Sequence, residues 1–170
     1  MDDHEKTCAC GACGGALDRP MDSDCWLPDV LFERWSKASN RPELRPLDFA
    51  ELGRRRFVHG LLPFPVEGGD TFRVGIWIEV DGFTFERVKK AWGKPSSYVA
   101  LAFEGRLAND VRLFGTRTLG VEVRARARRA EARPFVERAF DPALAALLRQ
   151  GWSEAQYQEV VQAVAKREAR

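Results

Sequence analysis

The sequence predicts an α+β domain with a largely antiparallel sheet and flanking helices, preceded by an N-terminal cysteine knuckle. Alternating apolar and polar residues in three segments, 57–62, 71–80 and 118–129, indicate strands. Helical periodicity at 82–92 and after residue 141 indicates helices, and three cysteines cluster between residues 8 and 13. Apolar residues make up 45% of the chain and charged residues 31%, a balance typical of a globular protein and not of a disordered or fibrous one.

The first two strand patterns predict a hairpin around the turn "EGGD" at 67–70. The first strand begins near Phe57, and Pro63 and Pro65 are expected to stop or bulge it because proline donates no ladder hydrogen bond. In the second strand, 71–80, one face carries only apolar residues: Phe72, Val74, Ile76, Ile78 and Val80. Trp77 falls on the other, more polar face, as expected for a half-buried antiparallel strand.

The middle of the chain predicts a helix and two further strands. Phe85, Val88 and Trp92 recur at helical spacing from Asp81 onward, and Gly93 is placed to end the helix. The segment "SSYVALAF" at 96–103 is a strand candidate, followed by the turn "EGRLAND" at 104–110. The segment "TLGVEVRARARR" predicts a strand whose outer face is basic.

Two helices are expected to close the chain after an extended segment at 135–140. Asp141 is the N-cap of the first, with proline at its first helical position, and Gly151 ends it. Ser153 and Gln156 form a capping-box pattern for the second. The pair resembles a DNA-reading helix-turn-helix only superficially, because the second helix presents glutamate and glutamine. We therefore expect the two helices to pack against the sheet.

Three parts are predicted: a cysteine segment at 1–28, a helix and connector at 29–54, and an α+β core domain at 55–170. The connector is rich in proline and leaves room for one short helix, at 29–38. The acidic start "MDDHEKT" is unlike a signal peptide, and no apolar run is long enough to span a membrane. A cytoplasmic protein with no membrane contact is expected.

Cysteines clustered in a reducing compartment favour a metal site over disulfides. The spacing Cys10-x-x-Cys13, followed by two glycines, suits one half of a tetrahedral zinc site, and Cys8 and Cys25 are the candidates for the other half. The predicted cofactor is therefore structural zinc bound by Cys8, Cys10, Cys13 and Cys25. Reduced thiols in the N-terminal segment, a redox pair and a small disulfide knot are the alternatives. The redox pair is disfavoured because no strand precedes the cysteines.

Two other groups of residues are candidates for chemistry. His59 lies in a strand next to three arginines, and a pocket around His59 and Trp77 would make the protein an enzyme or a small-ligand protein. A packed strand histidine is the simpler interpretation. Five arginines between Arg124 and Arg133 could contact nucleic acid, but three glutamates interleave with them, so an exposed face with salt bridges is favoured.

Several motifs together resemble a bacterial family of uncharacterised proteins, domain of unknown function 2199, over about residues 8 to 160. The motifs are the knuckle from Cys10 to Gly14, "RRFVHGLLPFPV", "FRVGIWIEV" with the helix ending at Trp92, "GRLAN", "RPFVE" and "DPALAALLRQGWS". Many relatives carry a histidine soon after the knuckle and a cysteine before the first core strand, whereas this chain has Cys25, and it has His59 where arginine is common. The resemblance implies a shared fold and no particular reaction.

The sequence thus favours a zinc-stabilised binding or interaction module over an enzyme, because a site made only of thiolates has no open position for substrate water. A protein partner is expected, and an exposed sheet edge could pair two copies. The net charge of only +2 gives no general attraction to nucleic acid. A ligand pocket at His59 and nucleic-acid binding through Arg124–Arg133 are the alternative functions.

Overall fold

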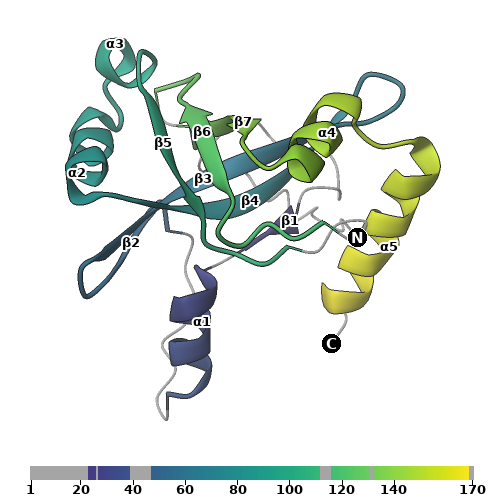
Figure 1. Ribbon diagram of the computed structural model, residues 1–170, viewed down its shortest axis with the longest axis horizontal. Helices are drawn as coiled ribbons and strands as arrows, with labels where there is room; N and C mark the ends of the chain where they lie inside the picture. The colour runs from purple at the N-terminus through teal and green to yellow at the C-terminus, as the bar shows by residue number, and fades with distance from the viewer. Residues whose placement is uncertain (1–22, 26, 39–46, 112–115, 131, 169–170) are drawn as a thin grey trace, which may run out of the picture.

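Five strands close into a mixed barrel in the computed structural model, which describes residues 23–25, 27–38, 47–111, 116–130 and 132–168. The barrel strands are β3 (Arg55–Pro65), β4 (Thr71–Val80), β5 (Ala102–Leu107), β6 (Glu122–Arg126) and β7 (Phe135–Ala139). Neighbours in this order pair antiparallel, and β7 returns to pair with β3 in parallel (Figure 1). The predicted α+β class with a largely antiparallel sheet is thus confirmed.

In the described part of the chain, two short strands and five helices surround the barrel. The strand β1 (Ser23–Asp24) pairs with β4, and β2 (Phe49–Leu52) pairs with β3. In Figure 1, the helices that follow β4 lie at one end of the barrel and those that follow β7 at the other. The helices are α1 (Asp29–Ser36), α2 (Gly82–Ala91), α3 (Pro95–Tyr98), α4 (Pro142–Gln150) and α5 (Glu154–Glu168).

The barrel interior is filled by the apolar faces that the alternation predicted. Leu62, Val74 and Ile78, which are even-numbered residues of β3 and β4, are at most 2% exposed. Phe85 of α2 belongs to the same core cluster, as does Trp152, whose ring stacks on Phe64 at the other end of the hairpin, with centroids 4.6 Å apart. Side chains therefore fill the barrel and leave no axial channel, as expected for so few strands.

Pro63 lies within β3, so the expectation that it stops or bulges the strand is wrong, whereas Pro65 is the last residue of β3, where the strand stops as expected. Their register partners in β4 are Arg73 and Thr71. The odd-numbered N–H groups of β3 point away from β4, since His59 N donates to Asp48 O and Leu61 N donates to Pro134 O, both at 2.9 Å. Beyond Leu61 no strand among the described residues pairs with that edge, and Trp152 N donates to Pro65 O there, so a proline at 63 or 65 removes no ladder hydrogen bond.

The strand expected at 96–103 is mostly wrong as well. Pro95 begins the short helix α3, because its fixed φ suits the first helical position. Tyr98 is buried there, and its hydroxyl donates to Ala132 O at 2.8 Å. The expected turn at 104–110 is instead half strand, since β5 runs to Leu107 with its register set by pairing to β6.

The predicted helix caps are confirmed. Asp141 accepts a hydrogen bond from Leu144 N at 2.8 Å, and Asp81, which was not predicted as a cap, accepts one from Thr84 N at 2.7 Å. Ser153 and Gln156 form the expected capping box. None of the helices in the described part of the chain combines the length and the hydropathy that crossing a membrane requires.

Gly151 should be far more sensitive to substitution than Gly68. Both have positive φ, but a Cβ at Gly151 would collide with Pro65 O, whereas nothing lies within 4 Å of one at Gly68. Gly151 has φ 70° and ψ −161°, a region almost confined to glycine. In urea unfolding, we expect Gly151→Ala to lower the free energy of unfolding by more than about 3 kcal/mol and Gly68→Ala by about 1–2 kcal/mol. Equal losses would contradict the close packing of residue 151 on β3.

Candidate functional site

His59 is packed, and the described residues around it form no pocket of the kind that the sequence suggested. It is 1% exposed, its ring is stacked on Trp77 with centroids 4.3 Å apart, and its Nδ1 lies 2.8 Å from Leu47 O. Trp77 is fully buried, and its indole N–H donates to Cys25 O at 2.7 Å. The alternative of an enzyme or ligand pocket around His59 is therefore wrong, because β1, α1 and β2 cover this face of the hairpin.

Asn109 is a structural residue that sequence reasoning missed. It lies between the two strands that share one edge of β4, and its Oδ1 accepts the hydrogen bond of Trp77 N at 2.8 Å. Its Nδ2 donates to Leu27 O and to the Asp29 carboxylate, which in turn accepts from Asp110 N. The buried amide thus fastens α1 to the barrel.

The five arginines between 124 and 133 do not form one basic face. Arg124 and Arg126 each donate to one oxygen of Glu137, at 3.1 and 2.8 Å. Arg133 is only 4% exposed and lies 3.5 Å from the Asp48 carboxylate. The favoured interpretation, an exposed strand face with salt bridges, is confirmed for Arg124 and Arg126.

The predicted zinc ligands Cys8, Cys10 and Cys13 lie outside the described residues. Cys25 is half-buried beside β4, and its N–H donates to Gly75 O at 2.9 Å. Within the described part of the chain, no group of three or more His, Cys, Asp or Glu side chains could hold a metal ion.

A cavity of about 620 Å³ opens where the barrel closes. Strands β3 and β7 pair only at Leu61 and Phe135 and then diverge, and α4 lies across the gap that they leave. We call this space the seam cavity. Its apolar walls come from β3, β7 and α4: Pro63, Pro65, Phe135, Val136 and Leu148.

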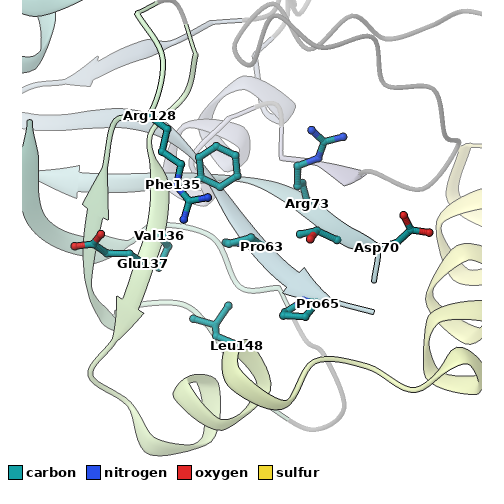
Figure 2. A pocket seen from close by; sticks show the side chains of 10 residues that line it. Pro63, Pro65, Asp70, Arg73, Arg128, Phe135, Val136, Glu137 and Leu148 are labelled. Atoms are coloured by element: carbon teal, nitrogen blue, oxygen red, sulfur yellow. The ribbon is translucent and has the colours of Figure 1, made fainter. Parts of the chain in front are cut away.

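The polar walls of the seam cavity carry both signs of charge: Asp70, Thr71, Arg73, Arg128 and Glu137. Figure 2 shows the Arg128 guanidinium beside the Phe135 ring and directed toward Pro63, whereas the Glu137 carboxylate points away from them. The Arg128 guanidinium carbon lies 4.8 Å from the centroid of the Phe135 ring. Asp70 and Arg73 lie farther off, on the β4 side.

Glu137 is already neutralised by its two arginines. The hydrogen bond from Arg126, with the charges of Arg126 and Arg124, lowers the pKa of Glu137 below its ordinary value. Each Glu137 oxygen is engaged, so this carboxylate has little capacity left for a ligand cation. No carboxylate among the described residues forms a salt bridge with Arg128, which leaves its charge available to the cavity.

The seam cavity has the size of a small-molecule pocket. Its volume falls within the range of about 300–1,000 Å³ that small-molecule pockets span. None of the described residues that line it is a His, Cys, Ser or Lys, and Thr71 is the hydroxyl-bearing residue among them. Sequence reasoning missed this site because its walls come from four segments whose meeting depends on barrel closure.

The pKa of Glu137 should depend on its salt bridges with Arg124 and Arg126, which we call the clamp. In side-chain ¹³C NMR, we expect its midpoint below the ordinary value of 4.5 and a rise toward that value in Arg126→Gln. Because the pKa is depressed in the folded state, the stabilisation is complete above the unfolded pKa and is lost as pH falls through the folded pKa. Arg138→Gln, on the same strand, is the control and should leave the midpoint unchanged. An unshifted midpoint in Arg126→Gln would contradict the clamp.

Comparison with known proteins bears out the resemblance noted from the motifs. No curated protein and no solved structure matches the chain. A family model described as an uncharacterized protein conserved in bacteria, DUF2199, matches residues 9–151. This match covers most of the chain, and the protein therefore belongs to the DUF2199 family of conserved bacterial proteins.

Proposed function

We propose that this bacterial protein is a binding module whose ligand site is the seam cavity. The observation that carries the proposal is the divergence of β3 and β7 after a single residue pair, which leaves about 620 Å³ between rigid elements. Strands and a helix supply most of the walls, with Asp70 and Arg128 in connecting segments, so most of the site exists before the ligand arrives and little ordering free energy is lost on binding.

The mixture of walls also supports a ligand site. Small-molecule pockets are mostly apolar and hold a few polar groups that fix orientation. Here Pro63, Pro65 and Leu148 provide apolar surface, and Arg128 provides a charge beside an aromatic ring. This proposal replaces the predicted pocket at His59 and keeps the interpretation of the protein as a binder. The cytoplasmic location, the protein partner, the absence of nucleic-acid binding and the possible homodimer stay predictions.

Filling the seam cavity should abolish ligand binding. In ¹H–¹⁵N NMR with a library of small aromatic and aliphatic compounds, we expect the compounds that bind to shift the amides of Thr71, Val136 and Leu148. Leu148→Trp places an indole in the cavity from α4 and should remove these shifts. Leu119→Trp is the control, because Leu119 is 48% exposed and lies outside the cavity. Shifts that gather elsewhere, or that persist in Leu148→Trp, would contradict the proposal.

We further propose that zinc bound by Cys8, Cys10, Cys13 and Cys25 ties the N-terminal segment to the barrel. Two considerations support this proposal. The Cys10-x-x-Cys13 spacing suits a tetrahedral thiolate site. Cys25 is anchored to β4 by its own N–H and to Trp77 by its carbonyl. In such a site the metal would be structural and separate from the seam cavity.

Metal analysis of tag-free protein by plasma mass spectrometry tests the zinc site. We expect about one zinc per chain, and its loss in the double variant Cys10→Ser and Cys13→Ser. The matched control, Ala9→Ser and Ala12→Ser, adds the same two hydroxyls and should keep the metal. A freshly reduced wild-type protein without zinc would contradict the assignment.

A further inference from the structure

We propose that the ligand of the seam cavity is an organic monocarboxylate with an apolar body, and that Arg128 recognises its carboxylate. The inference rests on the proposed function, because it names the chemical class of ligand for that same site. Two observations support the inference: the position of the Arg128 guanidinium and the charges of the side chains around it.

The Arg128 guanidinium lies over the Phe135 ring, a cation–π contact that leaves its hydrogen-bond donors in reach of a ligand. A guanidinium stacked on a ring uses its flat face, while its N–H groups project from the edge in the plane. The guanidinium carbon lies 4.8 Å from the Phe135 centroid, and Figure 2 places the group toward Pro63 and the centre of the cavity. A planar fork held in this way matches the two oxygens of a carboxylate.

The surrounding charges favour a single negative charge on the ligand. Glu137 is held by Arg124 and Arg126, so these three side chains together carry one positive charge and oppose no anion. Asp70 and Arg73 also line the cavity and carry opposite charges, and Asp70 would repel a dianion such as a phosphate monoester more strongly than a monoanion. The charges of Asp70 and Arg73 balance, so Arg128 supplies the net positive charge of these three side chains, which suits a monocarboxylate better than a dianionic phosphate.

The remaining walls of the seam cavity favour a ligand with an apolar body. Pro63, Pro65 and Leu148 surround the space below Arg128, and none of them can donate a side-chain hydrogen bond. A ligand that is polar throughout would lose its water contacts there without replacement. An apolar group next to the carboxylate avoids this cost and contributes favourable burial.

A matched pair of probes isolates the charge. Naphthalene-2-carboxylate and naphthalene-2-carboxamide have nearly the same shape and differ by one negative charge, and their dissociation constants can be measured from the NMR shifts of Thr71 and Val136. At low salt we expect the wild-type protein to bind the carboxylate about tenfold more tightly than the carboxamide. In Arg128→Gln we expect the two compounds to bind with about equal dissociation constants, and the carboxamide to bind as it does to the wild-type protein.

The control variant is Arg138→Gln, which removes an exposed arginine of β7 that stacks on Phe140 and does not line the cavity. It should keep the preference for the carboxylate. The carboxylate assignment would be overturned if the wild-type protein bound the carboxylate and the carboxamide equally, or if Arg128→Gln kept the wild-type preference for the carboxylate. Either result would leave the cavity as a binding site. Tighter binding of 2-naphthyl phosphate than of the carboxylate would overturn it too. If neither naphthalene compound shifts the cavity amides, both the assignment and the proposed function fail.

Discussion

Strand β3 pairs along both of its edges, and the rest of the structure depends on this double pairing. One edge forms a ten-residue ladder with β4, and the other meets β7 at Leu61, whose N–H donates to Pro134 O. Without that second contact, the five strands would be an open sheet with two exposed edges. With it, the apolar faces of all five strands point to one interior, and the β3 edge goes without a strand partner among the described residues only beyond Leu61.

The same contact explains why a cavity lies beside a well-packed core. Because β3 and β7 are parallel neighbours at one residue pair only, they separate immediately beyond it. Two prolines continue β3 along the separated edge, where no partner requires an N–H, and α4 covers the opening. Closure and divergence therefore occur within a few residues of each other, and the functional proposal is a consequence of how the barrel closes.

Electrostatics decides what the cavity can hold. Glu137 lies on β7 opposite Arg124 and Arg126 of β6 and forms a salt bridge with each of them. These two arginines are therefore already paired and do not attract a ligand anion. Arg133 is buried next to Asp48. Among the five arginines between residues 124 and 133, Arg128 lines the cavity and lies over the Phe135 ring. A stretch that looks like a nucleic-acid surface by composition thus presents one directed guanidinium to the seam cavity.

Local signals were enough to predict most elements, because caps, turns and alternation are set by neighbouring residues. The hairpin, the helix after Asp81 and the capped helix after Asp141 all follow from such signals. The errors occur where a distant partner decides. Residues 96–101 look like a strand but have no strand to pair with, and Trp77 looks half-exposed but is covered by segments that precede it in sequence. No local sequence pattern predicted the seam cavity, because its walls are brought together only when the barrel closes. The prolines of β3 did mark the part of the β3 edge that has no strand partner.

Hydrogen exchange of the Leu61 amide tests barrel closure most directly. This N–H points away from β4 and has Pro134 O as its acceptor, so it is protected only if β3 and β7 meet. Closure predicts that Leu61 exchanges as slowly as Leu62, which is buried in the hairpin next to it. Exchange of Leu61 at the rate of an exposed amide, with Leu62 still protected, would mean that the sheet is open and that the seam cavity does not exist.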